Sequence, residues 1–269
     1  MIRTAVIMAR GLGTRMRRGD SQAVVSVAQA AVANEGLKGM IPIERPFLEY
    51  VISALADAGI RRVVMVVAPG PNRIREHFSR QPGLSRVNIE WAEQAQPVGT
   101  ADAVLCAAGV VGNEPFIVLN ADNYYPVQAY AALAELEAPA VVAFDRHGLA
   151  RDGNISENRL RSFAALDISP DGWLRGIVEK PGHLLDPGSD AARWVGMNLW
   201  SLNSEVVDAC RRVPRSSRGE YELPEAVALA LSEGLQVRAV TMAAAVLDLS
   251  QQSDIASVVE KLSGVTPVL

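Results

Sequence analysis

Short apolar runs separated by helical segments constrain the fold more than any other feature of this sequence. Residues 4–9 (TAVIMA), 62–68 (RVVMVVA) and 116–120 (FIVLN) are almost entirely apolar. A run without polar alternation is typical of a strand that is buried on both faces. Helical segments, at residues 47–58 and 100–110, lie between these runs. The alternation predicts an α/β fold, with a Rossmann-like, mostly parallel twisted sheet and helices on both faces.

The pattern changes after residue 144. Residues 162–168 and 174–179 flank Pro170-Asp171-Gly172, which predicts a hairpin. Residues 146–161 are polar and predict an irregular, solvated segment. The remaining expected elements are a strand at 195–202, an extended segment at 245–249, and helices at 203–213, 221–233 and 253–262. Together they indicate a smaller antiparallel region attached to the sheet.

Composition excludes several classes of protein. The 269 residues carry 26 basic and 30 acidic side chains, so general binding to nucleic acid or to anionic membranes is not expected. No apolar run approaches the roughly 20 residues of a membrane span. Cys106 and Cys210 fit neither a disulfide framework nor a metal motif. No signal-peptide pattern precedes the first strand, which favours a cytoplasmic protein.

A glycine-rich turn follows the first strand and carries the first chemical signal. Gly11, Gly13 and Thr14 are followed by Arg15, and Lys38 comes after a further gap. Such a turn lets backbone N–H groups approach a phosphate, and two cations suit a polyphosphate. No Gly-Lys-Ser/Thr follows, so the turn is not a P-loop. An ordinary strand-to-helix turn with surface cations explains this pattern equally well.

Residues 8–16 (MARGLGTRM), 38–43 (KGMIPI) and 45–51 (RPFLEYV) resemble motifs of the sugar-1-phosphate nucleotidyltransferases, the NDP-sugar pyrophosphorylases. The resemblance implies that Arg15 and Lys38 are catalytic and hold the phosphates. It also implies that a loop wraps the nucleotide, through Ala9, Gly11, Gly13 and Thr14.

Residues 94–103 (QAQPVGTADA) resemble the base-recognition loop of the same family. The resemblance implies nucleotide contacts from Gln94, Gly99 and Thr100. A glutamine amide offers both a donor and an acceptor, which suits a pyrimidine and favours UTP or dTTP. The alternative is a surface glutamine followed by a helix that Thr100 caps.

Two aspartates match the family's metal positions. Asp122 follows the apolar strand in Leu119-Asn120-Ala121-Asp122, and Asp248 lies in Leu247-Asp248-Leu249. The resemblance implies that they hold Mg²⁺, a cation that prefers oxygen ligands. In this chain Ser250-Gln251 stands where the family commonly has Gly-Thr. An aspartate in a turn after a strand is the alternative for Asp122.

Three further blocks resemble the family's sugar-phosphate pocket: residues 179–181 (EKP), 195–200 (VGMNLW) and 219–226 (GEYELPEA). They imply sugar-phosphate contacts from Glu179, Lys180, Gly196, Asn198 and Glu222. A solvated strand edge is the alternative for the first block, and a helix-capping carboxylate is the alternative for Glu222.

Two features depart from the family pattern. Arg10 replaces a glycine, so its side chain either crowds the nucleotide or adds a cation. Residues 21–37 form an Ala-rich insertion, predicted to be one helix, that acts as a lid, an oligomer contact, a cap over the nucleotide or an inert surface segment. A homo-oligomer is compatible with this segment. We expect Arg151, Arg159 and Arg161 to lie in a solvated loop.

The resemblance implies one nucleotidyltransferase domain over residues 1–269, without a hexapeptide-repeat tail. Residues 1–145 would be the nucleotide-binding half, and residues 146–269 would bind the sugar phosphate and supply the last helices. The expected reaction converts an NTP and a sugar 1-phosphate into an NDP-sugar and pyrophosphate. The alternatives are transfer of a cytidylyl or guanylyl group, transfer to a non-sugar phosphate, and a non-catalytic regulatory protein that binds an NDP-sugar.

Overall fold

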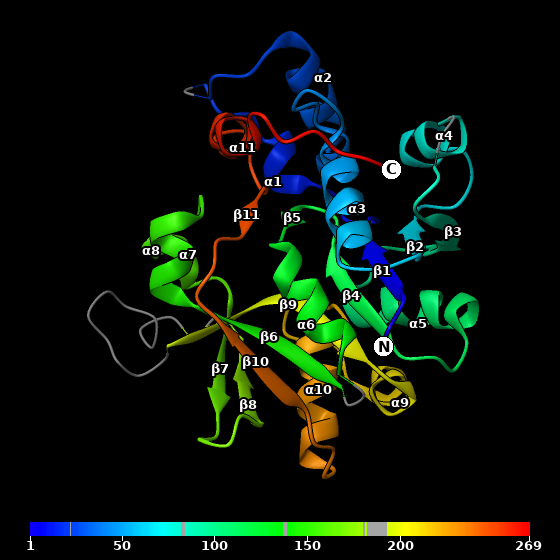
Figure 1. Ribbon diagram of the computed structural model, residues 1–269, viewed down its shortest axis with the longest axis vertical. Coiled ribbons are helices and arrows are strands. Elements are labelled where there is room, and N and C mark those ends of the chain that lie inside the picture. The colour runs from blue at the N-terminus through cyan, green and yellow to red at the C-terminus, as the bar shows by residue number, and fades with distance from the viewer. Residues whose placement is uncertain (22, 82–83, 137–138, 180, 182–192) are drawn as a thin grey trace.

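A mixed, mostly parallel sheet forms the centre of the protein (Figure 1). The structure, a computed structural model, describes residues 1–21, 23–81, 84–136, 139–179, 181 and 193–269. The main path of the sheet is, in order, β10 (Arg238–Met242), β6 (Ala140–Asp145), β9 (Trp194–Leu202), β4 (Phe116–Asn120), β1 (Thr4–Met8), β2 (Arg62–Val67) and β3 (Asn88–Glu93). Strand β9 is antiparallel to both of its neighbours, and the other pairs on this path are parallel. The predicted fold class is therefore confirmed.

Both halves of the sequence contribute to this one sheet. Strand β9 lies between β4 and β6, and its Leu202 pairs with Phe116 of β4. Strand β10 occupies the edge beside β6, with Arg238 opposite Ala140. The 1–145 and 146–269 segments therefore interleave, and elements from both can reach one end of the sheet.

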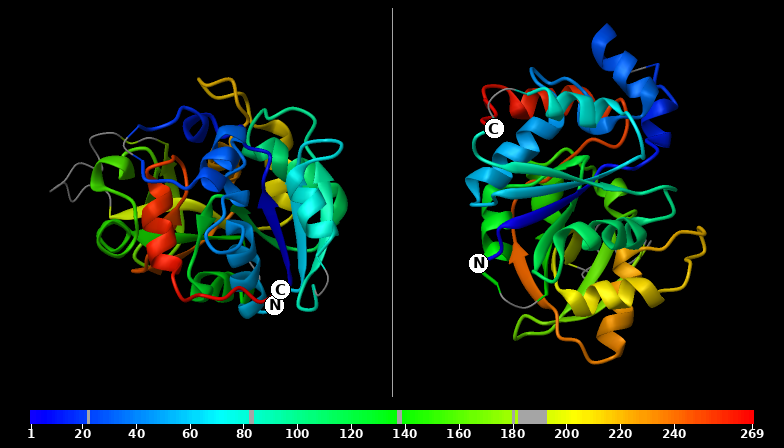
Figure 2. Two further views of the ribbon diagram at one scale, coloured as in Figure 1. Left: turned by 90° about the horizontal axis from the view of Figure 1, so that it is seen from above. Right: turned by 90° about the vertical axis from the view of Figure 1, so that its right-hand side faces the viewer.

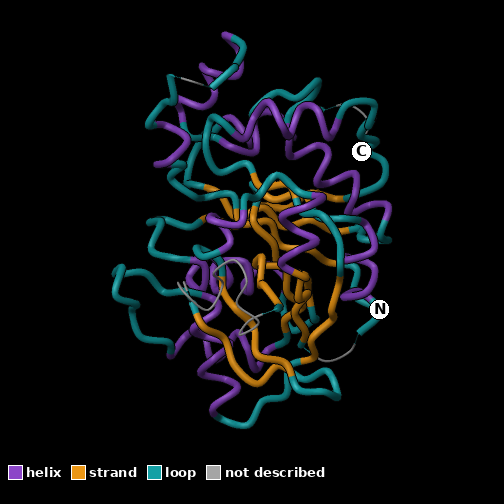
Figure 3. The backbone as a smooth tube through the Cα atoms, turned by 90° about the vertical axis from the view of Figure 1, so that its left-hand side faces the viewer, coloured by secondary structure: helices purple, strands orange, loops and turns teal. Residues whose placement is uncertain are grey.

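Helices cover the two faces of the sheet (Figures 2 and 3). Neighbouring residues of β1 point to opposite sides: Val6 and Ile7 are both fully buried, in different apolar clusters. On the Ile7 side lie α3 (Phe47–Asp57), α4 (Arg73–Ser79), α6 (Val127–Ala134) and α11 (Asp254–Leu262). On the Val6 side lie α5 (Thr100–Val111), α9 (Ser204–Arg212) and α10 (Leu223–Ser232). None of the helices in the described part of the chain has the length and apolar character that a membrane crossing requires.

Two small antiparallel units complete the fold. Strands β7 (Ala164–Ile168) and β8 (Leu174–Val178) form the predicted hairpin, and β7 also pairs with β9. Strands β5 (Asn123–Tyr124) and β11 (Leu247–Asp248) form a separate two-stranded sheet. This second pairing joins segments that lie more than a hundred residues apart in the sequence.

The structure corrects the prediction of one helix over residues 21–37. Helix α2 (Val27–Glu35) begins only at Val27, and residues 23–26 are not helical. The reason is a capping box: the Ser26 hydroxyl accepts from the Gln29 N–H, and the Gln29 side chain accepts from the Ser26 N–H.

The prediction that residues 146–161 are irregular is also wrong. They contain α7 (Arg146–Asp152) and α8 (Glu157–Leu160). The Asp145 carboxylate accepts hydrogen bonds from the N–H groups of His147 and Gly148, which caps α7. Leu149 is fully buried and anchors this helix to the core.

Candidate functional site

A cleft of about 470 Å³ opens where β1, β4 and β8 end. Its size is within the usual range for small-molecule sites, and its place beyond the carboxyl ends of strands is usual for open α/β sheets. Predicted site residues that line it are Ala9, Gly11, Gly13, Thr14, Arg15, Lys38, Gly99, Thr100, Asp122, Glu179, Gly196, Asn198, Glu222 and Asp248. Lys180 lies outside the described residues, and Gln94 does not line the cleft.

The glycine loop is held by the end of the insertion. Gly13 has φ +61° and precedes α1 (Thr14–Arg17), and a Cβ placed on it would lie 2.2 Å from the carbonyl oxygen of Gly36. Gly36 caps the end of α2 at φ +76°. Arg17 donates two hydrogen bonds to the carbonyl of Glu35, from Nε at 3.2 Å and Nη2 at 2.9 Å. The end of the insertion, at Glu35 and Gly36, therefore packs against the glycine loop and supports it.

Gln94 lies behind the cleft and stabilises the loop that follows it. The side chain is 3% exposed, and its amide donates to the Gly99 carbonyl at 3.0 Å and to Asp102 Oδ2 at 2.8 Å. The Arg10 Nε donates to the backbone carbonyl of Gln94 at 3.2 Å, so Arg10 links the glycine loop to this segment. The Gln94 amide N–H group therefore already donates to acceptors within the protein. Contact between Gln94 and a nucleobase stays a prediction.

Gly99 joins the two sides of the cleft. Its φ of +129° and ψ of 173° belong to a region that only glycine occupies readily, and a Cβ there would lie 2.2 Å from the Tyr221 carbonyl oxygen. Tyr221 exchanges backbone hydrogen bonds with this loop, donating to Val98 O at 2.8 Å and accepting from Ala101 N at 2.9 Å.

Thr100 makes a further contact between the Gly99 loop and the segment that contains Tyr221. Its hydroxyl accepts from the N–H of Leu223 at 2.8 Å, which links the start of α5 to the start of α10. Gly99, not Thr100, is the N-cap of α5, so the capping alternative for Thr100 is wrong.

The opposite side of the cleft is acidic, with one arginine. Glu222 is 6% exposed and forms a two-point ion pair with Arg218, including an Nε–Oε1 distance of 2.9 Å. Glu222 occupies the N-cap position of α10, as the helix-terminus alternative predicts, but its side chain makes no capping hydrogen bond. Sequence reasoning missed Arg218; its spacing of four residues from Glu222 is the signal that could have indicated the pair.

Asn198 presents a strained backbone to the cleft. It has φ +56°, the only positive value for a non-glycine residue in the described part of the chain. It lies in β9 beside an irregularity in the pairing with β6. Such conformations cost about 1–3 kcal/mol and concentrate at functional sites. Gly196, two residues earlier, leaves room for Leu166, whose side chain would be 3.3 Å from an added Cβ.

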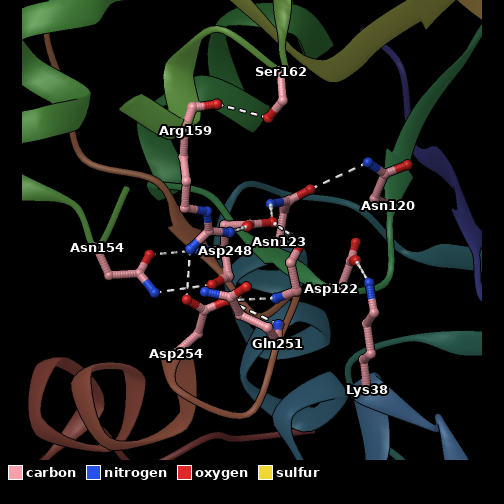
Figure 4. A network of polar contacts seen from close by, with 11 residues as sticks. Lys38, Asn120, Asp122, Asn123, Asn154, Arg159, Ser162, Asp248, Gln251 and Asp254 are labelled. Atoms are coloured by element: carbon pink, nitrogen blue, oxygen red, sulfur yellow. Dashed lines mark hydrogen bonds and ion pairs between the residues drawn. The ribbon is translucent and has the colours of Figure 1, made fainter. Parts of the chain in front are cut away.

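The two predicted metal-binding aspartates lie close together (Figure 4). Asp248 of β11 pairs in register with Asn123 of β5, the residue after Asp122. The Asn123 amide donates to Asp248 Oδ1 at 2.9 Å. On the cleft side, Lys38 from the 3₁₀ helix η1 (Lys38–Met40) donates from Nζ to Asp122 Oδ2 at 2.7 Å. The short β5–β11 pairing thus brings both carboxylates to the cleft.

The charges at this point suit a divalent cation. Burial, with repulsion from Asp122 as a second cause, raises the pKa of Asp248 to about 6, although Arg159 acts in the opposite direction. A hard cation that binds to two adjacent carboxylates offsets the repulsion between them. The described residues contain no group of three or more His, Cys, Asp or Glu side chains that could hold a metal. The pair fits Mg²⁺ if phosphate and water oxygens complete the coordination.

Arg159 is part of this network, contrary to the expectation of a solvated loop. From α8 it forms ion pairs with Asp248 Oδ2 and, at 2.5 Å, with Asp254 Oδ1. Its side chain is 22% exposed. Asp254 Oδ2 in turn accepts from the N–H groups of Ser250 and Gln251, each at 2.9 Å. No sequence motif indicated Arg159, because its two partners lie about ninety residues away.

Comparisons with known proteins show which family this chain resembles. The UTP–glucose-1-phosphate uridylyltransferase YngB of Bacillus subtilis (strain 168) is 26% identical over 259 residues, covering 84% of this chain and 78% of that protein. The glucose-1-phosphate thymidylyltransferase of Streptomyces griseus is 27% identical over 238 residues. The match covers 87% of this chain and 59% of that protein.

A solved structure of UDP-glucose pyrophosphorylase complexed with UDP-glucose shares the fold. Its TM-score is 0.75 at 15% sequence identity, and the alignment covers 98% of this chain and 99% of the other. A family model described as nucleotidyl transferase matches residues 31–263, which span most of the chain. The predicted family is thereby confirmed: this chain belongs to the nucleotidyl transferases.

Proposed function

We propose that this protein transfers a nucleotidyl group from UTP or dTTP to a sugar 1-phosphate, with Mg²⁺, and releases pyrophosphate. The observation that supports this most strongly is one cleft that is lined by fourteen of the predicted nucleotide, sugar-phosphate and metal residues. Relatives whose names specify transfer of uridylyl or thymidylyl groups to glucose 1-phosphate support the choice of donor and acceptor.

The reaction is a direct displacement. An oxygen of the sugar phosphate attacks the α-phosphorus of the NTP, a new P–O bond forms, and the bond to the β-phosphate breaks as pyrophosphate leaves. Catalysis of this kind depends on positioning and charge neutralisation. Arg15 and Lys38 neutralise the triphosphate and the attacking phosphate, and N–H groups of the loop from Ala9 to Thr14 bind phosphate oxygens.

The other cleft residues orient the two substrates. The loop at Gly99 lies against the base, whereas Glu179 and Glu222 accept hydrogen bonds from sugar hydroxyls. Asp122 and Asp248 would hold Mg²⁺, which supplies positive charge to the phosphate oxygens when bound. The β5–β11 pairing keeps these two carboxylates at the phosphate end of the cleft.

The test is pyrophosphate release measured with UTP, dTTP, CTP, GTP and ATP against a panel of sugar 1-phosphates. We expect turnover with UTP or dTTP and at least one sugar 1-phosphate, and a matching NDP-sugar product. Arg15→Ala is the inactive control, and circular dichroism checks its fold. Turnover restricted to CTP or GTP would overturn the choice of donor. Folded protein that binds an NDP-sugar in a thermal-shift screen without any turnover would instead indicate the regulatory alternative.

A further inference from the structure

The two carboxylates at the base of the cleft are neutralised in different ways. Asp122 pairs with Lys38, the one cation that contacts it among the described residues, and both side chains are 21% exposed. Asp248 is almost entirely buried and is held from several directions. Its Oδ1 accepts from Asn123 at 2.9 Å and from the Ser250 hydroxyl at 3.1 Å, and its Oδ2 pairs with Arg159. The first ion pair is therefore partly exposed on both sides, whereas the second involves a buried carboxylate with several hydrogen-bond partners.

Arg159 is fixed by more than one contact. Its two terminal nitrogens bridge Asp248 and Asp254, and Asp254 is itself anchored at the start of α11 by the N–H groups of Ser250 and Gln251. The planar guanidinium group holds its nitrogens in a fixed arrangement, so the two contacts together fix its orientation. Lys38 instead places a single flexible ammonium group on Asp122, within reach of the Gly13–Arg15 loop that lines the same cleft.

The net charge of the network depends on whether Lys38 stays at Asp122. The network contains three carboxylates, Asp122, Asp248 and Asp254, and two cations, Lys38 and Arg159, so it carries one net negative charge. If Lys38 moves to a triphosphate, the network carries two negative charges, which a divalent cation neutralises. If Lys38 stays, the cation meets a competing positive charge at Asp122.

We propose that Arg159 is a permanent positioning residue for Asp248, whereas Lys38 is an exchangeable counter-ion of Asp122 that leaves when triphosphate binds. The protein alone therefore binds a divalent cation weakly, and the cation and the nucleotide bind cooperatively. The triphosphate part of this inference rests on the proposed function; the competition between Lys38 and a cation does not. Reciprocal coupling of this kind follows whenever one group must leave a site before another can enter.

The test uses Mn²⁺ as a probe of the full chain without nucleotide, with free Mn²⁺ measured by electron paramagnetic resonance. We expect Lys38→Met to bind Mn²⁺ about threefold to fivefold more tightly than the wild type, the scale for removal of one partner of a partly exposed ion pair. Lys261→Met is the matched control, because Lys261 is bonded to the Asp152 carbonyl, outside the network. Adding Asp122→Asn to Lys38→Met should abolish the gain. Equal Mn²⁺ affinity in Lys38→Met and wild type would overturn the exchange.

Arg159→Gln tests the second part. In the Lys38→Met background, a positioning role predicts that Arg159→Gln weakens Mn²⁺ binding although one positive charge is lost, because Asp248 is no longer held in place. Tighter binding would show that Arg159, like Lys38, is a counter-ion that competes with the cation. Unfolding in urea shows whether the variant is folded, and Arg159→Lys, which keeps the charge but cannot bridge both carboxylates in the same way, should also weaken Mn²⁺ binding. Lower stability with unchanged Mn²⁺ affinity would show a purely structural role. These titrations contain no substrate, so a failed proposal for the function and a failed inference give separate results.

Discussion

Gly99→Ala should destabilise the protein and disable the cleft together. The substitution places a methyl group 2.2 Å from the Tyr221 carbonyl oxygen, where ordinary contact begins near 3.4 Å, so the segments must separate by about 1 Å. The backbone at φ +129° adds about 1–3 kcal/mol of strain for any residue with a Cβ. Loss of the two backbone hydrogen bonds at Tyr221 adds about 1 kcal/mol each.

We therefore expect the free energy of unfolding to fall by about 3–5 kcal/mol, from a typical total of about 5–15 kcal/mol. The assay is urea unfolding followed by circular dichroism. Gly109→Ala is the matched control: it lies on the exposed side of the same helix, α5, with nothing within 4 Å of the added Cβ. In a helix interior the same change stabilises by about 0.5–1 kcal/mol. The same substitution is thus expected to lower the free energy of unfolding at residue 99 and to raise it at residue 109.

Catalysis should respond as well, because a displacement of 1 Å in a reacting geometry can lower a rate by about 10²-fold. We expect pyrophosphate release by Gly99→Ala to fall on that scale, at a temperature where urea titration shows the variant to be folded. An unfolding free energy within about 0.5 kcal/mol of the wild type would refute the steric reasoning. Lower stability with unchanged turnover would refute the role of the Gly99–Tyr221 contact in aligning the cleft.

Four further outcomes are expected. Arg15→Ala should lower turnover by about 10²–10³-fold without changing the unfolding curve. Asp122→Asn should raise the Mg²⁺ concentration required for half-maximal pyrophosphate release by at least about tenfold; an unchanged titration would remove Asp122 from the metal site. Burial raises the pKa of the Cys210 thiol to about 12, so a disulfide exchange reagent at pH 8 should label Cys210 only after unfolding. Burial alone would raise the pKa of Asp145, but hydrogen bonds from Arg193 and two backbone N–H groups lower it overall. Its stabilisation is therefore present above the ordinary carboxyl pKa and lost as the pH falls through the lowered value, and Asp145→Ala should cost about 1 kcal/mol at pH 7 and less in acid.

The parts of the fold that follow a local sequence pattern could be predicted. Buried strands such as β1 and β4 are almost entirely apolar because both faces are covered, and the hairpin at Gly172 has a strong turn sequence. The errors occurred where one side chain decided the outcome. Ser26 and Gln29 delay the start of α2, and Asp145 turns a polar segment into α7. Both are caps, which a window of hydrophobicity does not detect.

Some residues of the site could likewise be predicted from local motifs, and others could not. Motifs along the chain were sufficient to nominate Arg15, Lys38, Asp122 and Asp248, because each lies in a short block of defined order. Arg159 lies in no such block, because its ion-pair partners are supplied by β11 and α11, which are distant in the sequence.

Local sequence patterns were sufficient to predict the α/β class, the family resemblance and fourteen residues that line the cleft. Three features appear only in the folded protein: Gln94 is buried against Gly99 and Asp102, Gly36 supports Gly13, and Arg159 and Lys38 neutralise the two aspartates in different ways. The reason is physical. Periodicity and turn chemistry act between neighbours in the chain, whereas burial, charge pairing and steric contact act between segments that only folding brings together.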